Sequence, residues 1–134
     1  MPYLLLIVEP AEMRRKRPVE EGRLAYERML GFTEDIKARG VLLALDGLHP
    51  PSTGTRVSFS RGKPRVTDGP FAEAKEVIGG YWLIQVKSKA EAVQWASRCP
   101  AGDGDVIEVR QVQEMSDFPP DVQKAAGATR LGSR

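Results

Sequence analysis

Three short apolar runs constrain the fold of this 134-residue chain more than any other feature. They are residues 3–8 (YLLLIV), 41–45 (VLLAL) and 81–86 (YWLIQV). Short runs with apolar residues at consecutive positions are typical of strands that are covered on both faces. Gly79 and Gly80 precede the third run, and their missing side chains predict a bulge or a close backbone approach there.

Helical patterns lie between the apolar runs. Pro18 can open a helix that Gly40 ends. Its core-facing positions recur at helical spacing: Tyr26, Met29, Leu30, Thr33 and Ile36. Ser88 and Glu91 form a capping box, which predicts the start of a second helix that ends before Pro100. A last strand is expected at residues 106–112. Residues 55–60 and 65–67 alternate in polarity around a turn at 61–64, which predicts a hairpin with one face in water.

This order of elements predicts an α+β fold, namely a ferredoxin-like βαββαβ antiparallel sheet with an inserted β-hairpin. Its two helices cover only one face of the sheet, although three strands are apolar on both faces. We therefore expect a homodimer in which the bare faces of two sheets cover each other. The domain is expected to span residues 1–115, and a polar C-terminal tail with room for one helical turn follows at 116–134.

Composition excludes several functional classes. The chain has 20 basic and 18 acidic residues, so it lacks the overall positive field of a nucleic-acid-binding protein, and we expect no nucleic acid partner. The single Cys99 allows no disulfide within the chain, and a single histidine without a cysteine cluster predicts no metal or cofactor site. No apolar run reaches membrane-spanning length and no secretory signal is evident, which predicts a cytoplasmic protein.

The loop at residues 66–76 combines a carboxylate, a glycine, a proline and several charges at the exit of a strand. Asp68 could act there as a general base or could orient a substrate, provided that it sits in a partly dry pocket. An Asp-Gly-Pro turn also forms for backbone reasons alone, so both interpretations stay open. His49 is the only imidazole, and any imidazole chemistry must use it.

These residues predict a cleft between the sheet and the hairpin, with a small polar organic acid as its ligand. Asp68 and His49 are the candidate catalytic residues. The candidate ligand-binding residues are Thr67, Tyr81, Arg56 and Arg65. Basic clusters at 56–65 and 14–17 could each make a local anion site, although solvated faces explain both clusters equally well.

The segments TDGPFAE (67–73) and GGYW (79–82) resemble the signature of the YCII-related family, specifically its DGPF-domain branch. The resemblance extends over about residues 1–115. It implies a dimeric α+β barrel of ferredoxin-like protomers. Related barrels include small-molecule isomerases, dehalogenases and monooxygenases, and some family members are linked to sigma factors, so the fold alone does not select a function.

The resemblance transfers one site residue. The wider family has a proposed His and Asp pair with the histidine near the first helix, but residues 18–40 contain no histidine, and only Asp68 matches. The alternative to a small-molecule-binding protein or enzyme is therefore a noncatalytic dimeric module that docks onto a sigma factor or another transcription protein.

Overall fold

The computed structural model describes residues 1–127, apart from the side chains of Arg15 and Lys16. Strands β1 (Pro2–Pro10) and β5 (Glu76–Gln85) form the centre of a four-stranded antiparallel sheet. Strand β2 (Leu42–Gly47) lies at the edge beside β5, and β6 (Val106–Gln111) lies at the edge beside β1. The strand order β2-β5-β1-β6 confirms the ferredoxin-like α+β fold expected from the sequence.

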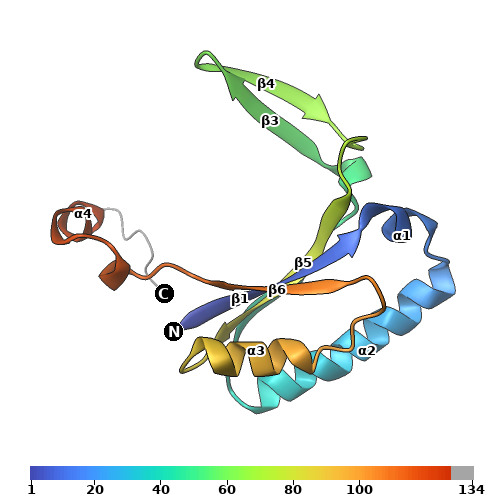
Figure 1. Ribbon diagram of the computed structural model, residues 1–134, viewed down its shortest axis with the longest axis horizontal. Helices are drawn as coiled ribbons and strands as arrows, with labels where there is room; N and C mark the ends of the chain where they lie inside the picture. Colours follow the sequence, from blue (N-terminus) through green and yellow to red (C-terminus); the bar gives the residue numbers. More distant parts are fainter. Residues whose placement is uncertain (128–134) are drawn as a thin grey trace.

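Helices α2 (Val19–Ala38) and α3 (Lys89–Ser97) lie together on one face of this sheet (Figure 1). Helix α2 ends at Ala38, and Gly40 follows it with a φ of 72°, in the left-handed region that glycine tolerates. Ser88 is the N-cap of helix α3, and its hydroxyl accepts the Glu91 N–H at 3.2 Å. The Glu91 carboxylate accepts the backbone N–H of Lys87, one residue earlier than a standard capping box would have it. A short helix that the sequence did not predict, α1 (Ala11–Lys16), connects β1 to α2.

Aromatic contacts hold α2 against the sheet. The Phe32 ring lies edge-on to Trp82 of β5, with 5.0 Å between ring centroids. The Trp82 indole N–H donates to Thr33 Oγ1 at 2.9 Å, so its polar atom is satisfied inside the core. The buried residues of this core are Tyr3, Leu5, Phe32, Ile36, Trp82, Ile84, Val86, Ala92 and Trp95. The core therefore fixes the distance between α2 and the central strands.

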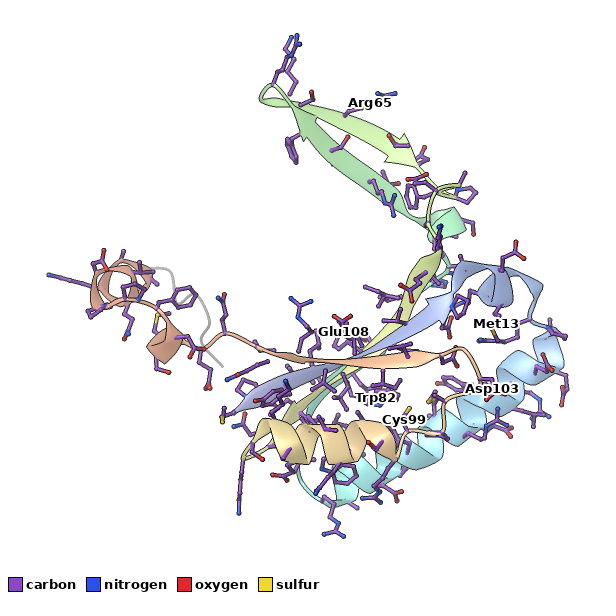
Figure 2. The ribbon with its side chains drawn as sticks, viewed as in Figure 1. Met13, Arg65, Trp82, Cys99, Asp103 and Glu108 are labelled. Atoms are coloured by element: carbon purple, nitrogen blue, oxygen red, sulfur yellow. The ribbon has the colours of Figure 1, made fainter. Side chains whose placement is uncertain are left out.

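The opposite face of the sheet carries apolar side chains that α2 and α3 do not cover. Leu4 pairs with Leu83 and Leu6 pairs with Tyr81, and all four are only half-buried. Figure 2 shows Glu108 of β6 on this face and Trp82 on the helix side. Side chains alternate between the two faces of a strand, so every second apolar residue of these strands packs in the core under the helices. The apolar residues between them lie on the face that no helix covers.

Strands β3 (Thr55–Ser60) and β4 (Lys63–Asp68) form a separate hairpin that projects on the side away from α2 and α3 (Figure 1). Arg61 and Gly62 make its two-residue turn, with φ of 51° and 77°. Every residue of both strands is exposed, including Phe59 at 74% and Val66 at 67%. The expectation of only one wet face is wrong for the single chain, because the projecting hairpin has both faces in solvent.

The C-terminal segment leaves the sheet after β6. It contains a 3-10 turn at Met115–Asp117 and the helix α4 (Pro120–Ala126), where the sequence predicted room for one helical turn. Figure 1 shows α4 far from the hairpin, beyond the end of the sheet where the chain begins. Residues 128–134 of the predicted tail lie outside the described part. Within residues 1–127, none of the helices has the length and apolar character needed to span a membrane.

Candidate functional site

A cavity of about 830 Å³ lies between α2 and the end of the sheet that carries α1. This volume falls in the range of small-molecule binding sites, roughly 300–1,000 Å³. The apolar part of its lining comes from the strands, the loop after β2, α1 and α2, and includes Ile7, Met13, Leu24, Met29, Leu45, Leu48 and Trp82. Figure 2 shows Met13 on the side of α1 that faces the loop of Asp103, and its sulfur lies close to Gly104 of that loop.

Glu9 lies in this cavity between two arginines. It is the one buried charged residue in the described part of the chain, at 7% exposure. Arg14 Nη1 donates to Glu9 Oε2 at 3.0 Å, and Arg17 Nη1 lies 3.5 Å from Oε1. Arg14 also donates through Nη2 to the Leu48 carbonyl at 3.0 Å. Two guanidinium groups thus share one carboxylate, and the local cluster of three side chains carries a net positive charge.

The glycine bulge makes room for this cluster. The register between β1 and β5 shifts at Ile7 and Val8, where Gly79 is the extra residue. A Cβ atom at Gly79 would lie 3.0 Å from Arg14 Nη1 and 3.1 Å from Glu9 Cδ. A Cβ atom at Gly80 would lie only 2.7 Å from the carbonyl oxygen of Asp46. The close approach predicted at the two glycines is confirmed, and it places a guanidinium against the strand backbone.

Tyr81 is the predicted ligand-binding residue in the cavity lining, to which it contributes from the open face of the sheet beside Asp46 of β2. Its hydroxyl donates to Asp46 Oδ2 at 2.7 Å. This hydrogen bond raises the pKa of Tyr81, and desolvation and the charge of Asp46 raise it further. The Tyr81 phenol is therefore a fixed neutral group beside the edge strand.

Asp105 contributes a second acidic feature to the lining. Its Oδ2 accepts the Gly102 N–H at 3.1 Å, whereas its buried Oδ1 has no hydrogen-bond partner among the described residues. Burial, together with the charge of Asp105, raises the pKa of the nearby Cys99 thiol to about 11. Cys99 Sγ donates weakly to Met29 Sδ at 3.7 Å. A half-buried thiol with this pKa is a poor nucleophile, so Cys99 has a packing role.

The two predicted catalytic residues do not line the cavity. Asp68 Oδ1 accepts the Thr55 hydroxyl at 2.8 Å at the base of the hairpin. Asp68 and His49 are both exposed, and His49 lies in the loop after β2. A general base at Asp68 would need a dry pocket, which the residue lacks within one chain. The catalytic roles of Asp68 and His49 stay predictions.

The loop after Asp68 holds the hairpin base through its backbone. The Gly69 N–H donates to the Gly54 carbonyl at 2.8 Å. A Cβ atom at Gly69 would lie 1.9 Å from the carbonyl oxygen of Pro51, so only glycine fits at this position. The Gly69–Pro70 peptide bond is cis. Close backbone packing thus accounts for the glycine of the motif without a ligand.

The remaining predicted ligand residues lie on the hairpin. The Arg56 guanidinium lies 3.9 Å from the centroid of the Phe71 ring and donates to Glu73 Oε1 at 2.8 Å. Thr67 and Arg65 are exposed, and Figure 2 shows Arg65 far out on the projecting hairpin. Arg56 is committed to the hairpin base, and none of the three lines the cavity.

Sequence reasoning noted the basic cluster at 14–17 but missed its partner Glu9. The available signal was an acidic residue at the end of an otherwise apolar strand, followed closely by several arginines. A carboxylate at the end of a buried strand needs a nearby cation, because an isolated buried charge is costly. That argument identifies Glu9, Arg14 and Arg17 as one cluster.

Comparison with known proteins gives a family and one short similarity. A family model described as the YCII-related domain matches residues 1–116. An uncharacterized protein from Rhizobium meliloti (strain 1021) is 41% identical over 49 residues, which is 37% of this chain and 40% of that protein. This similarity spans less than half the length of the relative, whereas the family match covers nearly all of the folded domain.

Proposed function

This chain belongs to the YCII-related family, and we propose that it binds a small organic acid in the cavity beside Arg14 and Arg17. The observation that carries the proposal is the sharing of the buried carboxylate of Glu9 by two guanidinium groups. An acid bound there would supply the second negative charge. A planar guanidinium recognises a carboxylate through two parallel hydrogen bonds, which gives both affinity and orientation.

Arg17 is the arginine that we assign to the ligand. Arg14 is fixed by two hydrogen bonds of 3.0 Å, one to Glu9 and one to the Leu48 carbonyl. Arg17 makes one long contact of 3.5 Å with Glu9, and its side chain is 24% exposed at the junction of α1 and α2. Turning Arg17 toward a ligand therefore breaks only this long contact with Glu9, and Arg14 keeps the Glu9 carboxylate paired.

The lining favours an acid with one charge and an apolar body. Glu21, Asp46 and Asp105 also line the cavity, and their carboxylates would repel an anion with several charges. The aliphatic and aromatic side chains of the walls suit a hydrocarbon or aromatic body. A hydroxyl or amino group on that body could donate to Asp105 Oδ1, which lacks a partner among the described residues.

A thermal-shift screen of monocarboxylic acids tests this function, because a ligand that binds the native state raises Tm. Removing one charge-assisted hydrogen bond costs about 1.5–3 kcal/mol, so Arg17→Gln should weaken binding roughly 10- to 150-fold. Arg23→Gln is the matched control, since Arg23 lies on α2, pairs with Glu20 and Glu27, and does not line the cavity. Equal shifts for wild type and Arg17→Gln would contradict the proposal.

We further propose that two copies pair through the bare face of the sheet. The support is the row of half-buried apolar side chains on the face that α2 and α3 leave open, including Leu4, Leu6 and Leu83. Leu83→Arg should shift the protein toward the monomer in sedimentation velocity. A wild-type protein that stays strictly monomeric would contradict this pairing.

The single cysteine supports a reducing compartment such as the cytoplasm.

Catalysis by Asp68 and His49 is a separate proposal that depends on such pairing, because a second copy could cover the exposed hairpin base. With an identified ligand, Asp68→Asn should abolish turnover and leave ligand binding unchanged. Unchanged turnover in this variant would remove Asp68 from the proposed chemistry.

The alternative function is docking onto a sigma factor or another transcription protein. Its support is the exposed hairpin with its basic residues Arg61, Lys63 and Arg65. The test is affinity capture with purified sigma factor at physiological salt. Binding that disappears when the three residues become alanine would favour docking, and absence of binding by the wild type would reject it.

A further inference from the structure

The projecting hairpin has two chemically different faces. Cross-strand partners share a face, so the pairing of Val57 with Val66 and of Phe59 with Pro64 creates an apolar face. The pairs between them place serines and basic residues on the opposite face: Arg56, Ser58, Ser60, Lys63, Arg65 and Thr67. An isolated two-stranded hairpin is at best marginally stable in water, and this one exposes 74% of Phe59. The apolar face therefore calls for a covering element.

The position of the hairpin determines what can cover it. The hairpin is attached at the end of the sheet where Pro10 pairs with Glu76. The C-terminal segment, residues 113–127, leaves from the opposite end, where Tyr3 pairs with Gln111. Figure 1 shows that the hairpin rises on the bare side of the sheet. It therefore points toward the space that a second copy would occupy if the bare faces were paired.

A twofold axis that runs across the strands accommodates both hairpins. Face-to-face sheets require a twofold axis that lies between them and parallel to their planes. An axis along the strands would bring both hairpins to the same end, where they compete for the same space. An axis across the strands reverses the strand direction of the second copy. The hairpin of each copy then lies at the end of the pair where the other copy's C-terminal segment leaves its sheet.

The two segments have complementary charge. The hairpin, residues 55–68, contains four basic residues, Arg56, Arg61, Lys63 and Arg65, and one acidic residue, Asp68. Residues 113–127 contain three acidic residues, Glu114, Asp117 and Asp121, against the single basic Lys124. The same segment offers apolar surface, because Phe118 is only half-buried and Val122 is 38% exposed. Opposite charge around apolar anchors is the usual composition of a specific interface.

We propose that the hairpin is an arm that binds the C-terminal segment, residues 113–127, of a second copy of this chain. The inference rests on the proposed pairing of bare sheet faces and adds a second, reciprocal contact to it. Phe59 and Val57 are the apolar anchors of the arm. Arg61, in the turn between the two faces, is the basic residue of the arm that can reach the acidic side chains of the partner, because Lys63 and Arg65 lie on the opposite face.

Photocross-linking tests the contact directly. A benzophenone amino acid in place of Phe59 is activated in a mixture of ¹⁵N-labelled and unlabelled protein, so that links between chains are recognised by mass. We expect links between chains that map to residues 113–127. Links confined to the same chain, links to another surface, or links only to other proteins in whole cells would overturn the proposal. The same amino acid in place of Tyr26, exposed on α2, is the control and should not link to residues 113–127.

Sedimentation equilibrium separates failure of the arm from failure of the pairing. Phe59→Ser should weaken dimerisation at least about tenfold without abolishing it, because the sheet faces remain. An unchanged dimer affinity in Phe59→Ser would overturn the arm and leave the pairing intact. A monomeric wild type would overturn both. Ser58→Ala, on the opposite face of the same strand, is the matched control and should not change the dimer affinity.

Discussion

Replacing Glu9 by glutamine tests the charge cluster that defines the cavity. The substitution keeps the shape of the side chain and one oxygen acceptor, but it removes the charge shared by Arg14 and Arg17. A hydrogen bond to a charged group contributes about 1.5–3 kcal/mol, and the 3.5 Å contact with Arg17 contributes less than the 3.0 Å contact with Arg14. Water reaches both arginines, which are about a quarter exposed, and offsets part of the loss. We expect the free energy of unfolding to fall by about 1–3 kcal/mol.

Urea-induced unfolding at fixed protein concentration measures this change, with circular dichroism and tryptophan fluorescence as two probes. Glu73→Gln is the control, because Glu73 pairs with Arg56 at 2.8 Å but is 73% exposed, and an exposed pair contributes at most about 1 kcal/mol. A Glu9→Gln protein that is as stable as the wild type would refute the reasoning. The same variant should bind an organic acid more tightly, because the competing carboxylate charge is lost.

Three further predictions follow from local geometry. Gly31→Ala should stabilise the protein by about 0.5–1 kcal/mol, because the added methyl on α2 meets no atom within 4 Å. Gly80→Ala should destabilise it by about 1–3 kcal/mol, because its Cβ would meet the Asp46 carbonyl oxygen; urea unfolding that shows the same sign for both variants would be inconsistent with this close approach. Alkylation of Cys99 should keep accelerating with pH up to about 11 and, at pH 8, run roughly a hundredfold slower than in unfolded protein; a rate that levels off near pH 9 would contradict its raised pKa. Asp46→Asn should lower the pKa of Tyr81 toward its ordinary value of 10.0, measured by absorbance at 295 nm with Tyr81→Phe to identify the signal; an unchanged titration would exclude the hydrogen bond as the cause.

The fold followed from local patterns because those patterns report burial and capping directly. The consecutive apolar residues of β1 and β5 predicted two-faced strands, and Ser88 predicted the start of α3. Gly79 and Gly80 predicted a bulge that the structure confirms. Helix α1 escaped prediction since it is short and polar, and so its sequence carries no apolar period.

The candidate site was harder to predict because its residues meet only through the tertiary fold. Glu9 and Arg14 are close in sequence, but α2 and the edge strand are what enclose them in a cavity. The motif around Asp68 attracted functional interpretation through its residue types. In the structure, Gly69 is explained by its close approach to Pro51, which no local sequence rule identifies.

Isothermal titration calorimetry with the most stabilising acid of the screen tests the central claim, that the cavity binds an organic anion through Arg17. The proposal predicts saturable binding by the wild type, a dissociation constant roughly 10- to 150-fold weaker for Arg17→Gln, and a tighter one for Glu9→Gln. Opposite changes in the dissociation constants of Arg17→Gln and Glu9→Gln are expected only if the ligand is an anion that binds beside this cluster. Identical dissociation constants for the wild type and both variants would place the ligand elsewhere and contradict the claim.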